Sequence, residues 1–245
     1  MRHTFSRRQF LKAAGMTTAT ACAAGLLSAC GSGSASSGGG AAAADTSSYT
    51  ILYSSQPATL NYLTTATDIE MVVGANCIDT LVEYDNKGVM REGLATEWEF
   101  DEPSLTWTFH LRDENWVDMN GEVVAPVTAQ DFVDALRYLL NPAYAASNVG
   151  LVTSYIAGAE AYYDYQVNLA NANSGLVEED GTTYTVDAGG AVTVSAPGAE
   201  PQTFAPVDFD TVGVKAVDEH TLTYTLTYDF PGFLSLLVYL PYEPA

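Results

Sequence analysis

Hydrophobic and polar residues alternate most regularly between positions 105 and 111. Every second position there is apolar, with Thr or His between: Leu105, Trp107, Phe109 and Leu111. Because successive side chains of a strand point to opposite faces of a sheet, this period of two predicts a β-strand with one buried face. Shorter apolar runs predict further strands at 50–53, 81–84, 212–217 and 221–228, and a turn at 218–220 pairs the last two.

Apolar residues recur at helical spacing after residue 128. Thr128 and Asp131 have the spacing of a capping box, with Asp in place of the usual Glu. The helix predicted there carries one apolar stripe, formed by Phe132, Leu136, Leu139 and Leu140, and it ends at Asn141-Pro142. Further helices are predicted at 68–79, 156–170 and 233–240, and Cys77 is expected to be a small buried residue of the first of these.

Residues 168–207 interrupt this pattern with a stretch rich in Gly, Thr, Ala and acidic residues. Two runs of β-forming residues, 182–186 and 192–195, flank a turn that contains Gly189-Gly190. Such a turn between two short strands predicts a surface hairpin. We interpret 168–207 as an insertion within a folded body that extends from 49 to 245.

The first 29 residues have the pattern of an export signal. A positively charged start is followed by an apolar run from Ala13 to Leu27, which is shorter than the ~20 residues that a bilayer-spanning helix needs. Residues 6–12, SRRQFLK, match the twin-arginine export consensus at each defined position and make Arg7 and Arg8 the export signal. An ordinary secretory signal that carries two arginines is the alternative.

Cys30 follows the sequence Leu27-Ser28-Ala29, which resembles the lipobox of bacterial lipoproteins. The thiol of such a cysteine receives a diacylglyceryl group, and several long acyl chains anchor a protein stably to a membrane. The Gly/Ser/Ala-rich residues 30–48 then form a flexible tether, and this composition disfavours the alternative of a buried core cysteine. We therefore expect a protein outside the cytoplasm, held on the cell membrane through Cys30, in the periplasmic space or on the outer face of the cytoplasmic membrane.

The charge balance excludes several classes of partner. The 245 residues carry 9 basic and 30 acidic side chains, a formal net charge of −21, and four of the basic residues lie in the leader. So acidic a body repels phosphate backbones and anionic lipid headgroups, which argues against nucleic-acid binding. No disulfide framework is possible with Cys77 as the one cysteine beyond the leader junction.

No pattern of catalytic residues is visible in the sequence. His3, His110 and His220 lack metal-ligand spacing, and neither a nucleophile elbow nor a phosphate-binding loop is present. We predict no enzyme activity, no metal and no cofactor. An acid/base role for the pair Asp113-Glu114 would require an apolar pocket, which the sequence does not reveal.

Several separated motifs resemble one family, the extracytoplasmic solute-binding proteins of peptide and nickel ABC importers. Residues 55–61 (SQPATLN) are similar to the family's opening motif, and residues 81–85 (LVEYD) and 93–99 (GLATEWE) to the next. Residues 107–112 (WTFHLR) and 127–132 (VTAQDF) continue the pattern, and 213–222 (GVKAVDEHTL) follow after the predicted insertion. The motifs occur in the family's order along the chain.

The resemblance implies a mixed α/β fold: a periplasmic-binding-protein type II-like lobe, with a mixed β-sheet and flanking helices. Two such lobes close on a peptide or similar small solute and deliver it to ABC permease subunits in the membrane. The second lobe is expected to be missing from this sequence. Nickel chelates and oligosaccharides are alternative solutes, and a truncated lipoprotein without a transport role is an alternative function.

The same resemblance indicates candidate ligand contacts. The family places the loop after the first strand at the cleft, where backbone groups pair with an extended peptide, and here this loop is Ser54, Ser55, Gln56 and Pro57. A plain surface turn is the alternative for these residues. Asp134 aligns where relatives often have an aromatic residue that faces the ligand, and a solvated acidic residue on a helix surface is its alternative.

Overall fold

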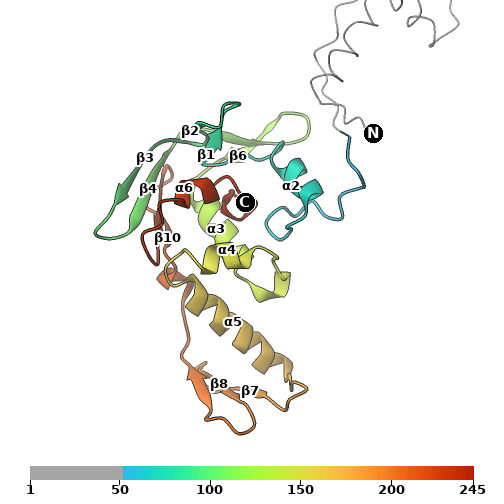
Figure 1. Ribbon diagram of the computed structural model, residues 1–245. Coiled ribbons are helices and arrows are strands. Elements are labelled where there is room, and N and C mark those ends of the chain that lie inside the picture. Colours follow the sequence, from blue (N-terminus) through green and yellow to red (C-terminus); the bar gives the residue numbers. More distant parts are fainter. Residues whose placement is uncertain (1–51) are drawn as a thin grey trace, which may run out of the picture. The chain divides into compact units, whose positions relative to one another are not determined.

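A four-stranded antiparallel sheet organises the residues that the computed structural model describes, which are 52–245 (Figure 1). The order of its strands is β10 (Val214–Ala216), β11 (Thr221–Thr225), β4 (Thr106–Leu111) and β3 (Ala95–Asp101). Phe109 of β4 lies opposite Leu222 on one side and opposite Trp98 on the other. The sheet therefore joins segments that lie more than 100 residues apart in the chain.

The strand with the clearest alternation is a central strand of this sheet. Phe109 and Leu111 are buried, and the partly buried Trp107 packs against the same core. Thr108 and His110 point to the other face. The strand begins at Thr106 because Leu105 adopts a left-handed backbone conformation with φ 53° in the preceding turn. The predicted pairing of the last two strands is also confirmed, with Lys215 opposite Thr223.

Helix α3 (Ala129–Leu139) packs against the sheet, as the apolar stripe predicts. All four stripe residues, Phe132, Leu136, Leu139 and Leu140, have no exposed surface. The Asp131 carboxylate accepts a hydrogen bond from the backbone N–H of Thr128 at 2.9 Å, which is one half of the predicted capping box. The same carboxylate accepts a bond from the Trp116 indole N–H at 3.0 Å and so connects the helix start to strand β5.

Two hairpins and several short helices surround this core. The hairpins are β1 (Val82–Tyr84) with β2 (Met90–Glu92), and β5 (Asn115–Val117) with β6 (Val123–Pro126). The helices are α2 (Asp68–Gly74), η1 (Pro142–Tyr144), α4 (Val149–Thr153), α5 (Ala159–Ser174), η2 (Phe209–Thr211), α6 (Phe233–Leu236) and η3 (Leu240–Tyr242). Buried Tyr242 donates its hydroxyl to the Leu151 carbonyl at 2.7 Å, which fixes the last helical turn against α4.

The predicted hairpin forms a small sheet of its own. Strands β7 (Thr183–Val186) and β8 (Val192–Ser195) pair as expected, and a third strand, β9 (Gln202–Phe204), pairs with β8. This sheet and α5 project from the rest of the described body (Figure 1). The buried Tyr165 of α5 donates its hydroxyl to the Gly190 carbonyl at 2.9 Å, so the hairpin turn is held on the helix.

Several local predictions were wrong. Leu52 and Tyr53 form no strand, and Leu52 is 93% exposed, because no strand within 52–245 pairs with them; Thr50 and Ile51 lie outside the described residues. Helix α2 ends at Gly74 and not at 79, so Cys77 follows the helix and is exposed. The predicted helix at 233–240 is divided into α6 and η3, and the one at 156–170 begins and ends later, as α5.

The leader, the tether and their functional residues Arg7, Arg8 and Cys30 lie outside the described residues. Within 52–245, none of the helices has the length and apolar character needed to cross a bilayer.

Gly93, between β2 and β3, tests how closely the chain there approaches the residues before β1. Its amide donates to the Leu81 carbonyl, and a Cβ added there would lie 2.3 Å from the Thr80 carbonyl oxygen. We expect Gly93→Ala to lower the free energy of unfolding by more than about 2 kcal/mol, because backbone atoms have to shift. Gly150→Ala in α4 is the matched control, with no atom within 4 Å of the new methyl group, and it is expected to be neutral or slightly stabilising. Chemical denaturation of both variants measures the difference, and equal effects would contradict the close approach.

Candidate functional site

The loop with the predicted ligand contacts is exposed and makes few internal bonds. Ser54, Ser55 and Gln56 are exposed, and Pro57 is partly buried. Among residues 52–245, no hydrogen bond involves the backbone groups of Ser54, Ser55 or Gln56. Within the described part of the chain, these backbone groups are therefore left without a partner.

A buried carboxylate fixes the end of this loop. Glu70 of α2 is 5% exposed, and its Oε1 accepts a hydrogen bond from the backbone N–H of Ala58 at 2.6 Å. That amide holds the pKa of the Glu70 carboxyl below its usual range, because the bond stabilises the charged form. The residue directly after the free backbone of 54–57 is thus tied to a helix.

The following residues dock onto α3 and the segment after it. The Asn61 side-chain amide donates to the Tyr138 hydroxyl at 2.9 Å, and the Tyr138 ring stacks on Tyr144 with 3.8 Å between ring centroids. The Asn148 side-chain amide donates to the Thr65 carbonyl at 2.9 Å. The loop 54–57 therefore precedes a segment that is attached at several points.

Asp134 lies on α3 one turn before Tyr138. Residues four apart share one side of a helix, so Asp134 and the Tyr138–Asn61 contact occupy the same side of α3. The Asp134 carboxylate is exposed and accepts a hydrogen bond from the Gln130 side-chain amide at 2.9 Å. No hydrogen bond or ion pair joins Asp134 to residues 54–57 among the described residues, so four of the five predicted residues form one loop and Asp134 lies on a separate element, α3.

A second buried carboxylate lies near the end of the chain. Glu243 is 1% exposed, and its Oε2 has no hydrogen-bond partner within the described residues. Burial raises the pKa of its carboxyl to about 8, and the negative charge of Asp79 adds to the effect. Glu243 lines a cavity of about 490 Å³ with Val238 and with residues of α2 and its C-terminal end, namely Asp68, Met71, Val72 and Ala75.

Tyr62 lies in the segment after the predicted contact loop and bonds to the residue that follows Glu243. Its hydroxyl donates a hydrogen bond to the Pro244 carbonyl. Burial, and then the charge of Glu243, raise the pKa of Tyr62 to about 12. Neither Glu70 nor Glu243 was predicted as part of a site, because the sequence gives no signal that a particular glutamate will be buried.

The described residues show no metal centre in this region. Within the part of the chain that the structure describes, no group of three His, Cys, Asp or Glu side chains is arranged to hold a metal ion. The features that the structure brings together are free backbone groups on an anchored loop, and these suit recognition of an extended chain.

Comparisons with known proteins identify the family. Residues 89–245 match the model of bacterial extracellular solute-binding proteins, family 5 Middle, and residues 4–26 match the signal sequence of the twin-arginine translocation pathway. The oligopeptide-binding protein AliB of Streptococcus pneumoniae is 32% identical over 90% of this chain and 26% of its own length. The periplasmic oligopeptide-binding protein OppA of Haemophilus influenzae is 36% identical over 48% of this chain and 21% of its own.

The fold agrees with these sequence matches. The structure of the Escherichia coli murein tripeptide binding protein MppA is similar, with a TM-score of 0.55 and 25% identity over 77% of this chain and 28% of that one. The mixed α/β architecture is therefore that of a periplasmic-binding-protein lobe. The chain belongs to family 5 of the bacterial extracellular solute-binding proteins, and it spans about a quarter of the length of the curated relatives it matches. With its twin-arginine signal it is an extracytoplasmic protein.

Glu243 provides a test through the pH dependence of stability. Its folded-state pKa of about 8 exceeds its ordinary value of 4.5, so the stability it contributes is full below pH 4.5 and is lost as the pH rises to 8. At about 1.4 kcal/mol for each tenfold change in proton affinity, the loss is on the order of 3–5 kcal/mol. Glu243→Gln should therefore be more stable than the wild type at pH 9, by an amount that shrinks toward pH 4.5. Urea denaturation across this range measures the difference, and a difference independent of pH would show that folding does not raise the pKa of this carboxyl.

Proposed function

We propose that this protein is a lipid-anchored receptor that binds peptides outside the cytoplasm and delivers them to the permease of an ABC importer. The observation that carries the proposal is the loop Ser54–Pro57, whose backbone groups have no hydrogen-bond partner among residues 52–245, while the residues that follow are fixed to α2 and α3. A fixed loop with free N–H and C=O groups suits an extended peptide, because little conformational entropy is lost when the peptide pairs with it.

The relatives support the choice of ligand. AliB and OppA are named as oligopeptide-binding proteins, and MppA as a murein tripeptide binding protein. In this proposal Ser54, Ser55, Gln56 and Pro57 contact the backbone of the peptide, and Asp134 lines the same side of α3 as the Tyr138–Asn61 contact. The proposal concerns the face of the binding site that these residues form.

The proposed attachment to the membrane rests on the sequence. Residues 1–29 act as the export signal, Cys30 carries the lipid, and 30–48 form the tether that lets the folded body move relative to the membrane. Residues 168–207 are an insertion in this proposal, consistent with a three-stranded sheet that packs on α5 and does not join the four-stranded sheet.

The role of the loop backbone is tested by a pair of substitutions at one position. Gln56→Pro removes the backbone N–H at the centre of the loop, whereas Gln56→Ala removes only the side chain. We expect the proline variant to lose at least about tenfold in affinity for unblocked tri- to pentapeptides and the alanine variant to change by less than about threefold. Isothermal titration calorimetry on the purified full-length chain measures both. Equal losses in the two variants, or no binding of any peptide of the set by the wild type, would contradict the proposed contact.

Lipid attachment is tested at Cys30. We expect the wild-type protein to remain with the membrane fraction after a high-salt wash and Cys30→Ser to be released into the soluble fraction, because acyl chains and not charge hold the protein. Cys22→Ser is the matched control within the same leader, and it should stay on the membrane. A Cys30→Ser protein that still sediments with membranes would refute the anchor.

A further inference from the structure

Basic side chains are rare in the folded body, and two of them line one cavity. Residues 52–245 contain five, which are Lys87, Arg91, Arg112, Arg137 and Lys215. Arg91 pairs with Asp85 at 3.0 Å, and Arg112 pairs with acidic residues on two sides. Arg137 and Lys215 form no ion pair within the described residues, although the body around them is strongly acidic.

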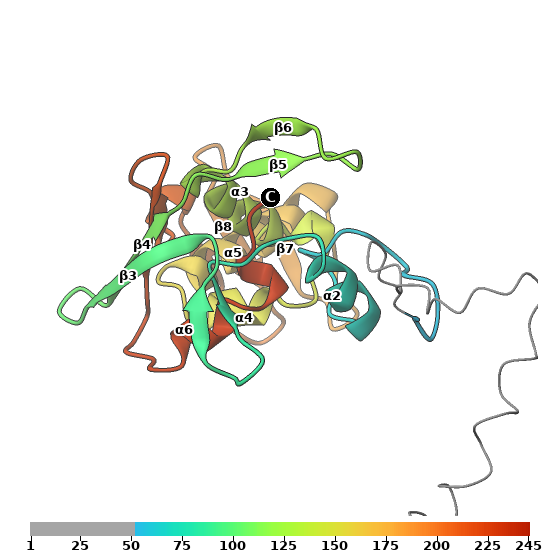
Figure 2. The same ribbon diagram turned by 90° about the horizontal axis from the view of Figure 1, so that it is seen from above.

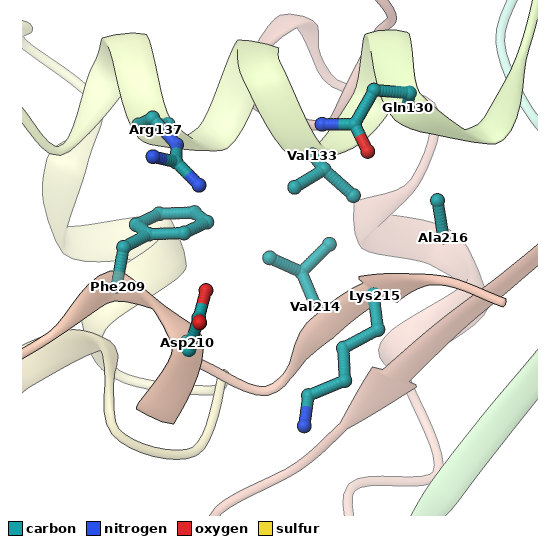
Figure 3. A pocket seen from close by; sticks show the side chains of 8 residues that line it. All are labelled: Gln130, Val133, Arg137, Phe209, Asp210, Val214, Lys215 and Ala216. Atoms are coloured by element: carbon teal, nitrogen blue, oxygen red, sulfur yellow. The ribbon is translucent and has the colours of Figure 1, made fainter.

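The cavity lies between α3 and the edge strand β10 and has a volume of about 340 Å³ (Figure 3). Its apolar surface comes from Val133, Val214 and the ring of Phe209. The Arg137 guanidinium lies over that ring, 4.3 Å from its centroid, which holds the charge in place at the cavity. Lys215 extends from β10 in the direction away from α3, so a positive charge is present on each face of the strand.

The free edge of β10 has unpaired backbone groups beside these charges. The Thr225 amide donates to the Gly213 carbonyl at 2.7 Å, and the Val217 amide donates to the Thr221 carbonyl at 2.8 Å. In an antiparallel ladder alternate residues bond to the same neighbour, so Val214 and Ala216 turn their backbone groups away from β11. The Ala216 N–H and C=O and the Val214 C=O have no partner within 52–245, and unpaired edge groups of this kind are a template for another strand.

We propose that the groove between α3 and β10 docks an extended acidic segment of a partner polypeptide, which adds to β10 as a further strand. Side chains of an added strand alternate between faces, so neighbouring acidic residues of the partner reach Arg137 on the α3 side and Lys215 on the other. Charge complementarity identifies the segment as acidic. A small anion would meet only one of the two cations, because they lie on opposite faces of β10, and it would leave the strand edge unpaired.

This docking groove is separate from the loop 54–57 of the proposed transport site, whereas Asp134 adjoins it through the hydrogen bond from Gln130. Helix α2 and the loop before it lie on the opposite side of α3 from the four-stranded sheet in both views (Figures 1 and 2). Asp210 is the one acidic residue that lines the groove. Together with Arg137 and Lys215 it gives the groove a positive net charge. The partner segment is thus distinguished from transported peptide by its place and by its charge.

The test uses a blocked peptide with a fluorescent label, acetyl-TVEEVEET-amide, and measures anisotropy with the purified full-length chain. Because both ends are blocked, the probe offers no terminal charge to a transport site. We expect Arg137→Gln combined with Lys215→Gln to weaken binding at least tenfold. The charge-matched control, Lys87→Gln combined with Arg91→Gln, should change binding less than twofold, and so should Gln56→Pro.

Two further measurements separate strand addition from charge attraction and from misfolding. Two probes carry N-methyl groups on alternate backbone nitrogens, one probe for each edge of the strand. Each keeps its charge but cannot pair along the methylated edge. One of the two should bind at least tenfold more weakly than the unmethylated probe. Arg137→Lys keeps the cation and should retain affinity within about fivefold, which shows that the groove variants lose binding through charge. Three results would each overturn the proposal. The first is that both N-methylated probes bind as tightly as the unmethylated probe, and the second is that the uncharged acetyl-TVQQVQQT-amide binds as tightly as the acidic probe. The third is that the acidic probe does not bind.

Discussion

The pairing of β4 with β11 is the constraint on which the described fold depends. It brings residues 106–110 against 221–225, and the two strands place Phe109, Leu222 and Tyr224 in one core. Helix α3 covers that core with side chains that are completely buried. Closing so long a stretch of chain costs conformational entropy, which the burial of this apolar surface offsets. This long-range pairing closes the segment between the two strands, including α5 and the small sheet, into one large loop.

The two proposed binding surfaces lie where this core stops satisfying backbone groups. The loop 54–57 precedes the first anchored residue, Ala58, and β10 forms an edge of the sheet. Both expose N–H and C=O groups that could pair with an extended polypeptide, but they differ in charge. The loop is followed by a buried carboxylate at Glu70, whereas the edge of β10 is flanked by Arg137 and Lys215. One fold thus offers two backbone surfaces with different electrostatic preferences.

The sequence was most informative where one physical rule dominates. Helix α3 buries one apolar face, and the turn at 218–220 joins two strands of compatible length. The helix and the strand pair were therefore both predicted with near-correct bounds. Prediction failed where a neighbour decides the outcome. The apolar residues Leu52 and Tyr53 form no strand without a partner, and Cys77 is exposed because α2 ends a turn and a half early. Strand β9 is three residues long and has too short a pattern to detect.

The sequence by itself determined the family, the twin-arginine signal and the main elements of the core, because these depend on local patterns of side chains. Only the tertiary structure decided which carboxylates are buried and which cations are unpaired. Glu70 and Glu243 look like the other glutamates along the chain, and they differ only in what packs around them. Likewise, Arg137 and Lys215 lie far apart in sequence and share one cavity because β10 folds against α3. Burial and charge pairing are properties of a side chain's neighbours in space, and a linear pattern does not specify them.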